Sequence, residues 1–367
     1  MALRIGIIGA AWGGFAHLPA WRAVPGVEVT AICTSRKATA EAAAERLGIF
    51  RAFCDAEAMC ADPDIDIVDC GTRPSIRKPM LLAALRHGKH VYNASPHAAD
   101  WASAKEIDAA WRDSGSVGVV DAFSQWIPAH RQMKAMVAEG YVGTPVGGTC
   151  RFNISLFNTP TRQFPYNWFA EAGQGVSAVR NNGSHMLYML LHLFGPVAEL
   201  SADDRQILNE WVFEDGGKIT PETTDFANVI LRFVSGMTMQ MQISWSMTLH
   251  DGWLIDVFGN KGRIAASSPT FPTMRDCVLH AGQLGGSFAP VEIAESYKHL
   301  TGVALGADDE PQPSVAMAFS MHTMVAAIAG NGTASPGFAQ ALEVERIQEA
   351  IRLSNKARSW VTVSDVV

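Results

Sequence analysis

The feature of this sequence that most restricts its fold is the alternation of apolar runs and helical stretches in its first third. The strand-like apolar runs cover residues 3–9, 27–34, 65–71, 90–92 and 117–121. Helices are expected between them at 37–47, 76–87 and 100–112, and Gly48 is a typical C-cap for the first of these. Strands that alternate with helices are joined by right-handed crossovers in a parallel sheet. The pattern therefore predicts an α/β fold over residues 1–123, a doubly wound parallel sheet of the Rossmann type.

Residues 124–367 follow a different pattern. After one helix over 129–139, apolar and polar residues alternate with few helices between them, which predicts antiparallel strands with one covered face. The expected strands are 146–157, 224–233, 238–245, 254–258 and 263–266, and the expected helices are 184–194, 315–328 and 339–354. We expect the last two helices to cover the sheet. The second domain is thus predicted to be α+β with an open, mostly antiparallel sheet, through which we expect a homo-oligomer, either dimer or tetramer.

The composition favours a folded chain with packed cores and argues against several partners. With 48% hydrophobic and 18% charged residues, a chain of 367 residues can build two packed cores. The formal net charge of −7 argues against nucleic acid and against an anionic membrane surface. The sequence contains no membrane-length apolar run and no signal-peptide layout. Its six cysteines lack metal-ligand spacing, so we expect reduced thiols, no metal site and a cytoplasmic protein.

A glycine-rich loop follows the first strand and precedes a helix. The dinucleotide-binding fingerprint Gly-x-Gly-x-x-Gly needs glycine at positions 9, 11 and 14, and Ala11 replaces the middle one. The middle position lets the backbone approach a pyrophosphate, and a methyl group is the smallest obstruction there. In this context we predict a dinucleotide site that includes Gly9, Ala11, Trp12, Gly13 and Gly14. The alternative is an ordinary tight turn between strand and helix.

The end of the second strand bears on which dinucleotide is bound. An NAD-specific site places Asp or Glu there, but this chain has Thr34, Ser35, Arg36 and Lys37. Two cations at a helix N-terminus oppose the helix dipole, and a bound 2′-phosphate would resolve that conflict. The residues therefore favour NADP(H). The alternative is that Ser35 is a simple N-cap beside two solvated charges.

The next long strand ends in Gly71, Thr72, Arg73 and Pro74. Ligands of open α/β sheets bind at the carboxyl edge of the strands, so we expect this segment to line the cofactor as well.

The order of these motifs resembles the glucose–fructose oxidoreductase, inositol dehydrogenase and MocA family over essentially the whole chain. The resemblance rests on residues 6–9, 66–74, 88–91, 173–175, 182–185, 257–262 and 344–363. It implies hydride transfer between a nicotinamide and a carbon bearing oxygen, mostly in sugars and cyclitols. It also implies cofactor contacts from Asn93, Ser95 and Gln125.

Two departures from the family pattern affect the expected catalytic residues. Ser95 stands where the family has the lysine of Glu-Lys-Pro, and Asn181 stands where it has an aspartate. A further acid three residues after the family's histidine is replaced by Tyr188. Only the histidine, His185, remains, so the resemblance implies that His185 donates or accepts the proton that accompanies hydride transfer. We expect it in the first turn of a helix, where the dipole keeps imidazole neutral.

Residues outside this group are candidates for binding the substrate. Either His97 or Tyr188 is expected to assist His185, and Gln125 and Trp126 fall where the family often places a residue between cofactor and substrate. In the loop 158–168 and just after it, Arg162, Tyr166, Trp168 and Arg180 suit a polar or acidic substrate with a stacking face. The alternatives are an ordinary surface loop and, for Trp126, packing at the domain junction.

The residues leave three functions open. The first is an NADP(H)-dependent dehydrogenase or reductase. The second is a non-redox enzyme that retains the cofactor and uses transient oxidation to drive elimination or hydrolysis. The third is a cofactor-binding regulator without catalysis, for which the family offers a precedent. The retained His185 argues against the third, since a sensor needs no proton donor.

Overall fold

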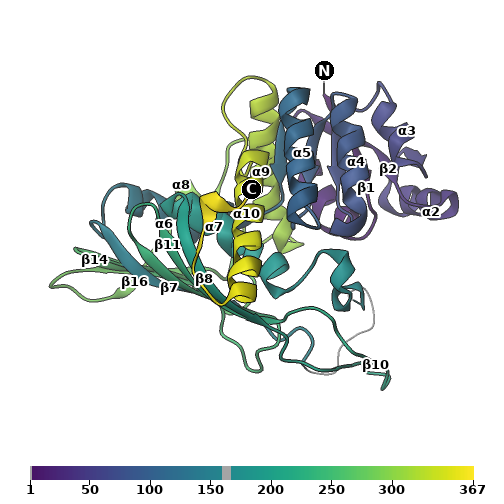
Figure 1. The fold of residues 1–367 in the computed structure, drawn as a ribbon. Helices are drawn as coiled ribbons and strands as arrows, with labels where there is room; N and C mark the ends of the chain where they lie inside the picture. The colour runs from purple at the N-terminus through teal and green to yellow at the C-terminus, as the bar shows by residue number, and fades with distance from the viewer. Residues whose placement is uncertain (1, 159–166) are drawn as a thin grey trace. The chain divides into compact units, whose positions relative to one another are not determined.

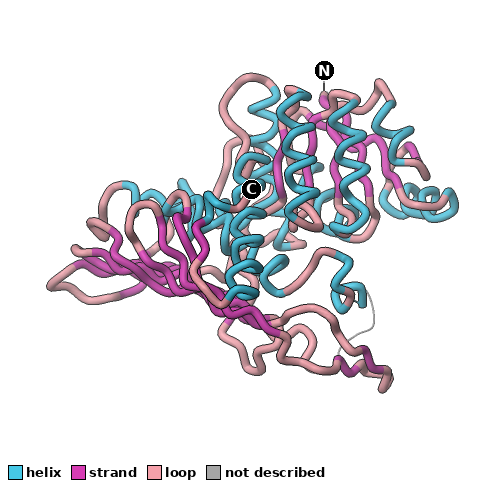
Figure 2. The backbone as a smooth tube through the Cα atoms, viewed as in Figure 1, coloured by secondary structure: helices cyan, strands magenta, loops and turns pink. Residues whose placement is uncertain are grey.

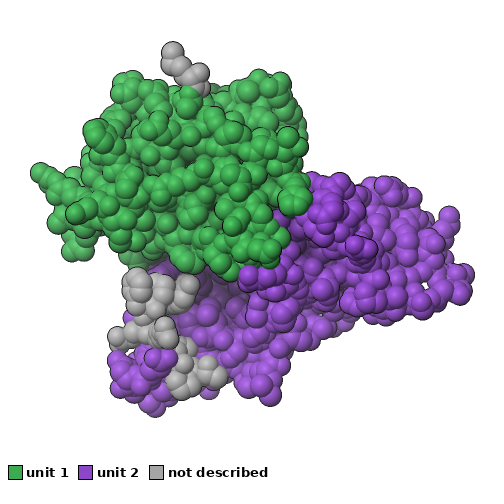
Figure 3. Space-filling view, turned by 180° about the vertical axis from the view of Figure 1, so that it is seen from behind, with its two compact units in different colours: residues 1–126, 299–342 green, residues 127–298, 343–367 purple. Residues whose placement is uncertain are grey.

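The structure is a computed structural model, and it describes residues 2–158 and 167–367. The chain forms two compact units, shown in different colours in Figure 3. Unit 1 contains residues 1–126 and 299–342, and unit 2 contains residues 127–298 and 343–367. Strands form a separate main sheet in each unit, as Figure 2 shows in magenta.

Unit 1 is the predicted doubly wound parallel domain. Its six strands are β1 (Leu3–Ile8), β2 (Val27–Cys33), β3 (Arg51–Phe53), β4 (Ile67–Cys70), β5 (His90–Asn93) and β6 (Gly118–Val120). They pair in the order β3-β2-β1-β4-β5-β6, and every pair is parallel. The order reverses direction next to β1, which is the point where open α/β sheets bind their ligands.

The helices of unit 1 connect these strands, and several are labelled in Figure 1. They are α1 (Leu18–Arg22), α2 (Lys37–Leu47), α3 (Ala56–Ala61), α4 (Pro74–Arg86) and α5 (Trp101–Ser114). Helix α2 has the predicted bounds, and Gly48 ends it in the left-handed conformation with φ 62°. Strand β3 and helix α3 were not predicted, because each is shorter than the windows in which periodicity is visible.

Helix α9 (Gln312–Ile328) also belongs to unit 1, where it packs against α1 and β6. The expectation that it covers the second sheet is therefore wrong. Helix α9 itself carries apolar residues on nearly all of its sides, so its sequence does not indicate which sheet it packs against. Helix α10 (Phe338–Ala357) begins in unit 1 and ends in unit 2.

Unit 2 contains a nine-stranded sheet in the order β16-β15-β14-β13-β7-β12-β11-β8-β17. Among its described strands only β7 and β12 pair in parallel, so the sheet is mostly antiparallel, as predicted. Its strands are β7 (Pro145–Asn153), β8 (Val197–Arg205), β11 (Phe226–Phe233), β12 (Thr238–Ser244), β13 (Gly252–Gly259), β14 (Gly262–Ser268), β15 (Val278–Gln283), β16 (Ala289–Val291) and β17 (Val361–Thr362). A separate hairpin pairs β9 (Trp211–Val212) with β10 (Lys218–Ile219).

The other helices of unit 2 are α6 (Pro128–Ala138), α7 (Ser184–Phe194) and α8 (Glu295–Lys298). Along β11 and β12, buried residues alternate with more exposed ones, so one face of the sheet is covered and the other is open. Val229, Leu231, Met239 and Met241 lie on the covered face.

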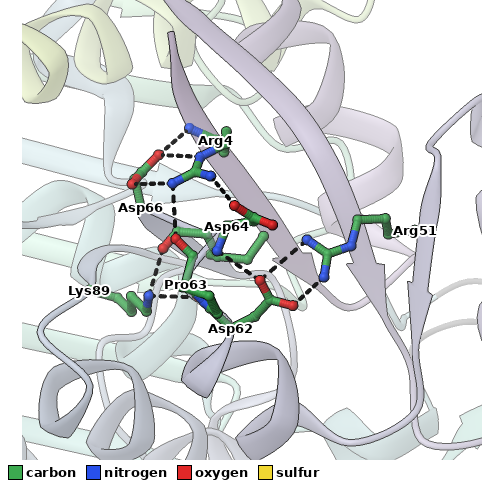
Figure 4. A network of polar contacts seen from close by, with 8 residues as sticks. Arg4, Arg51, Asp62, Pro63, Asp64, Asp66 and Lys89 are labelled. Carbon is green, nitrogen blue, oxygen red and sulfur yellow. Dashed lines mark hydrogen bonds and ion pairs between the residues drawn. The ribbon is translucent and has the colours of Figure 1, made fainter. Parts of the chain in front are cut away.

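Charged residues tie together the amino ends of the parallel strands (Figure 4). The Arg4 guanidinium donates to both oxygens of Asp66, and the Arg51 guanidinium donates to Asp62. Lys89 donates through Nζ to the backbone carbonyls of Asp62 and Ile65 at 2.8 and 2.7 Å. Asp66 and Lys89 belong to the motifs that carry the family resemblance. In this structure both residues form hydrogen bonds at the amino edge of the sheet, which is the edge opposite the one where ligands bind.

Candidate functional site

The loop after β1 depends on glycine because backbone segments approach closely there. Gly9 has φ 104°, and a side chain on it would meet the Gly71 carbonyl oxygen at 3.0 Å. A Cβ on Gly71 would lie 2.9 Å from the Gly13 nitrogen, and one on Gly14 would lie 3.1 Å from Leu47. These contacts place the segments after β1 and β4 against each other. Such a backbone cradle fits a pyrophosphate.

The segment Thr34–Lys37 connects β2 to α2 and is exposed from Ser35 onward. The N-cap of α2 is Arg36, whose side chain makes no capping hydrogen bond, so the alternative in which Ser35 caps the helix is wrong. Thr34 Oγ1 lies 2.6 Å from Thr39 Oγ1. The start of α2 therefore lacks a side-chain cap, which is the arrangement that binds an anion at a helix N-terminus.

Arg77 in α4 fixes the loops that follow β4 and β5. It is 1% exposed, and its guanidinium donates to the backbone carbonyls of Thr72, Ala94 and Pro96. Arg73 is the N-cap of α4, and Pro74 is its first residue. Arg77 thus joins two of the loops at the carboxyl edge of the sheet.

A buried histidine lies between two aspartates at the same edge. His17 ends the π-helical turn η1 (Gly13–His17), directly after the glycine-rich loop. Its Nδ1 lies 2.7 Å from Asp69 Oδ1, and its Nε2 lies 3.1 Å from Asp121 Oδ2. Trp21 donates to Asp69 at 2.6 Å, and Trp12 donates to Asp121 at 3.0 Å.

The charges in this cluster favour a protonated histidine. Burial alone would lower the pKa of His17, but the charge of Asp69, the hydrogen bonds to Asp121 and Asp69 and the charge of Asp121 outweigh it. Together they raise the pKa of His17 to about 9. Both ring nitrogens then donate, one to each carboxylate.

His17, Asp69 and Asp121 were not singled out from the sequence, although one signal was available. Asp69 interrupts the apolar strand β4, and a charge in a buried strand needs a buried partner. That partner is 52 positions away in the sequence, and no local pattern identifies it.

Two amide oxygens at the carboxyl edge lack partners among the described residues. Asn93 Nδ2 donates to His97 Nδ1 at 3.1 Å and to the His97 carbonyl at 2.9 Å, while its Oδ1 is buried without a donor. Gln125 donates to Ser335 Oγ at 2.8 Å, and its Oε1 is likewise buried without a donor. Buried acceptors of this kind are costly unless a donor arrives, so they fit a ligand with N–H groups.

Two of the expected substrate residues in unit 1 have structural contacts of their own. His97 is 2% exposed, packs edge to face on Phe338 at 4.6 Å, and burial and the Arg77 charge lower its pKa to about 3. His97 is therefore neutral. Trp126 donates through Nε1 to the Ser335 carbonyl at 3.1 Å.

The helix that carries His185 begins earlier than predicted. Helix α7 has the expected bounds, but helical backbone already starts at Ala178 and passes through the π-helical turn η5 (Val179–Gly183). Ser177 caps this start, because its Oγ accepts from the Arg180 backbone N–H at 3.2 Å. His185 thus lies beyond the first turn, where the dipole has little effect. The helix dipole therefore does not keep the His185 imidazole neutral, contrary to the expectation from the sequence.

His185 and Tyr188 are three residues apart in α7, a spacing that places them on one side of an α-helix, and Asn181 lies in the π-helical turn before it. His185 is half-buried and stands edge to face against Phe271, with ring centroids 4.9 Å apart. Tyr188 is 2% exposed, and Asn181 is half-buried. Three of the four residues predicted to be catalytic thus lie in one continuous helical segment, Asn181 in η5 and the other two in α7.

Helix α10 holds the π-helical turn that contains Asn181. Arg180 forms an ion pair with Glu345 at 2.7 Å and donates through Nε to the Gly175 carbonyl at 3.0 Å. Gln348 donates through Nε2 to the carbonyls of Val179 and Arg180 at 3.3 and 3.4 Å. A π-helical turn disturbs the regular ladder of hydrogen bonds, and Gln348 satisfies two of the carbonyls concerned.

The remaining predictions concern the loop before this helix and the thiols. Trp168 is half-buried and lies against Phe169 with centroids 4.3 Å apart, whereas Arg162 and Tyr166 fall outside the described residues. All six cysteines are free. Within residues 2–158 and 167–367, no cluster of His, Cys, Asp and Glu could hold a metal ion. No helix of the described parts is both long and apolar enough to cross a bilayer.

Comparison with known proteins matches both halves of the chain to one family. Residues 3–121 match "Oxidoreductase family, NAD-binding Rossmann fold", and residues 130–265 match "GFO/IDH/MocA C-terminal domain". A D-apiose dehydrogenase of Paraburkholderia graminis is 27% identical over 71% of this chain and 67% of its own length. A levoglucosan dehydrogenase of Pseudarthrobacter phenanthrenivorans is 23% identical over 99% of both chains.

The solved structures agree with these matches. The crystal structure of an NAD binding oxidoreductase from Klebsiella pneumoniae superposes with a TM-score of 0.87, at 26% identity over 99% of both chains. The parallel six-stranded sheet and the mostly antiparallel second sheet are the two parts that these matches cover. The protein belongs to the GFO/IDH/MocA family of oxidoreductases, with a nicotinamide-binding Rossmann fold in its first unit.

Proposed function

We propose that the protein is an NADP(H)-dependent oxidoreductase that acts on a small polyhydroxylated or cyclic alcohol or carbonyl compound, such as a sugar, cyclitol or sugar acid. The observation that carries this is the match of residues 3–121 and 130–265 to the family, together with His185 on helix α7. The relatives that act on apiose and levoglucosan support the substrate class. Bound NADP(H) would supply or accept the hydride.

His185 is the residue assigned to the proton. Oxidation of an alcohol needs a group that takes the hydroxyl proton, and reduction of a carbonyl needs a group that donates it. Imidazole can do either near neutral pH. Ser95 and Asn181 can orient a substrate oxygen by hydrogen bonds but cannot exchange a proton there. The substrate contacts assigned to His97, Trp126, Arg162, Tyr166, Trp168 and Arg180 belong to the same proposal.

The role of His185 is tested by measuring kcat and KM for a panel of sugars, cyclitols, sugar acids and aromatic carbonyls. His185→Gln keeps polarity but cannot transfer a proton, so kcat should fall about 100-fold or more while substrate KM changes little. His192→Gln is the matched control on the same helix, and it should retain wild-type rates. If kcat in His185→Gln stays within about 3-fold of wild type, His185 does not carry the proton.

We further propose that the cofactor is NADP(H) rather than NAD(H), through Thr34, Ser35, Arg36 and Lys37. The uncapped N-terminus of α2 and the two cations beside it support this assignment, since both favour a 2′-phosphate. The matched Rossmann family and the Klebsiella pneumoniae protein both bind NAD by name, so a preference for NADP(H) would set this chain apart from them.

The test is the ratio of the dissociation constants for NADH and NADPH. Arg36→Ala should weaken NADPH binding about 10-fold and leave NADH binding unchanged, because only NADPH carries the 2′-phosphate. Arg86→Ala, an exposed arginine at the end of α4 that pairs with Glu57, serves as the control. An unchanged ratio in Arg36→Ala contradicts the assignment.

A further inference from the structure

Asp121 follows β6 and joins three segments of unit 1. Its Oδ2 accepts from Trp12 Nε1 in the glycine-rich loop at 3.0 Å and from His17 Nε2 at 3.1 Å. Its Oδ1 accepts from the backbone N–H of Ser95, in the turn after β5. Asp121 is 3% exposed, so these contacts are made away from water. One carboxylate therefore links the loop after β1 to the turn after β5.

The number of donors explains why this residue is an aspartate. At least three N–H groups point at its two oxygens, so both oxygens must be acceptors. An asparagine of the same shape has only one acceptor oxygen. Its NH₂ group would face either the Ser95 N–H or the Trp12 and His17 pair, and donor would stand against donor.

Asp69 fixes the opposite side of the arrangement. It lies within β4, holds His17 at Nδ1 and accepts from Trp21, so the imidazole is anchored in the sheet. Tyr92 of β5 packs edge to face on His17 with centroids 5.3 Å apart. The orientation of Asp121 is thus set by groups on β4, β5 and the first helix, all of them buried.

We propose that Asp121 is a positioning residue for the dinucleotide site: it fixes the Trp12 loop relative to the Ser95 turn, with His17 as its anchor. The inference rests on the proposed function, because both segments are among those assigned to the cofactor. Asp121 acts through the two segments that it holds. A substitution that breaks the hydrogen bonds of Asp121 should weaken dinucleotide binding more than it slows the proton transfer assigned to His185.

The experiment measures dissociation constants for NADPH and NADH by calorimetric titration, together with the melting temperature of each variant. Asp121→Asn should weaken binding of the preferred dinucleotide about 10-fold or more, because one donor is left facing another. Trp12→Phe keeps an aromatic side chain but removes the indole N–H that Asp121 accepts, and alone it should weaken binding about 3-fold. His87→Gln is the control, a histidine far from the cluster whose Nε2 lies 2.8 Å from Glu57.

The double variant distinguishes a positioning role from a loss of fold. With Trp12→Phe in place, the amide NH₂ that Asp121→Asn introduces no longer meets the indole N–H, and His17 Nε2 can accept from it when the ring is neutral with its proton on Nδ1. Trp12→Phe/Asp121→Asn should therefore bind the dinucleotide more tightly than Asp121→Asn alone. Additive losses, or a lower melting temperature with unchanged binding in Asp121→Asn, overturn the proposal.

Wild-type behaviour separates this inference from the proposed function. If wild type binds neither NADPH nor NADH, the proposed function fails, and the inference fails with it. If wild type binds and Asp121→Asn binds equally well, only the inference fails. Should Asp121→Asn not fold, Trp12→Phe alone decides the matter, and an unchanged dissociation constant in it overturns the proposal.

Discussion

His17 carries a positive charge in a place that excludes water. With both ring nitrogens protonated, the imidazolium and the carboxylates of Asp69 and Asp121 leave one net negative charge in the cluster. Hydrogen bonds from Trp21, Trp12 and the Ser95 backbone N–H offset part of the cost of burying it. The hydrogen bonds of His17 to both aspartates therefore hold these three side chains in one arrangement.

This cluster makes stability depend on pH in a defined window. The pKa of His17 is about 9 in the folded protein, against about 6.5 when unfolded. Its contribution is fully present below about pH 6.5 and is lost as pH rises through about 9. The difference is on the order of 3 kcal/mol. Denaturant unfolding between about pH 6 and pH 10 measures it.

The groups that face His17 are Asp69, Asp121 and Tyr92, and burial raises the pKa of Tyr92 well above its usual value. Tyr92 therefore stays neutral across the window. His17→Gln should flatten the fall in unfolding free energy above about pH 7, whereas His87→Gln should keep it. The same slope in His17→Gln as in wild type would contradict the assignment.

At the residue scale, the sequence predicted positions that have local causes. The need for glycine at 9, 13 and 14 follows from the turn and from helix packing, and the structure shows the close approaches. The capping of α2 was open, and the structure excludes Ser35. The contacts of Asp121 could not be predicted, because its partners lie 26, 104 and 109 positions away.

At the element scale, two of the helical segments that carry candidate site residues begin with a π-helical turn. One is Gly13–His17, after the glycine-rich loop, and the other is Val179–Gly183, before His185. Each contains glycine and lies against a buried hydrogen-bonding group, Asp121 in the first case and Gln348 in the second. Wide turns of this kind are frequent at functional sites.

The second turn depends on Gln348, which leads to a prediction for α10. Gln348→Leu removes the donor to the carbonyls of Val179 and Arg180 and should let the turn relax. We expect a loss of about 1–3 kcal/mol in unfolding free energy. We also expect a fall in kcat, because Asn181 and His185 would change register.

Arg352→Gln is the control for this change, since it removes only an exposed pair with Glu349 on the same helix. The measurements are denaturant unfolding and steady-state kinetics. A Gln348→Leu variant with lower stability but wild-type kcat would show that the turn has no part in the site.

Most helices and strands were predictable because their periodicity is strong. Helix α7 and the strands β11 and β12 lie where the alternation placed them. The helical start at Ala178 was not predicted, because Asn181, Asn182 and Gly183 are poor helix formers. The parallel pairing of β7 with β12 was not predictable either, since alternation gives the covered face and not the neighbour.

At the scale of the whole molecule, the open face of the nine-stranded sheet leads to a prediction about assembly. Ile230 and Phe258 lie on this face and are 43% and 45% exposed, opposite a fully buried layer. We predict a dimer or tetramer formed through this face. Sedimentation velocity measures it, and Ile230→Glu/Phe258→Glu should give monomers, because two charges would be buried at the interface.

Phe50→Glu provides the control, an exposed aromatic residue of unit 1 that lies outside the sheet. It should leave the oligomer intact. A wild-type protein that sediments as a monomer over the accessible concentration range would contradict the prediction.

Which segments of the chain belong to which unit was harder to predict than the fold of each unit. Residues 299–342 return to unit 1 and place α9 beside α1. The sequence after 298 has no strand–helix alternation that would show this return. The proposed division at residue 123 describes where the Rossmann pattern ends, and packing adds the later segment to it.

The central claim is net hydride transfer to or from NADP(H), and absorbance at 340 nm tests it most directly. Purified protein is mixed with each compound of the panel and either NADP⁺ or NADPH, and product is quantified in the same samples. We expect one NADPH formed for each alcohol oxidised, or one NADPH consumed for each carbonyl reduced, at a rate that collapses in His185→Gln. Product without any change in absorbance would show cofactor-retaining chemistry, and tight NADPH binding without turnover would show a regulator. Either result would contradict the account.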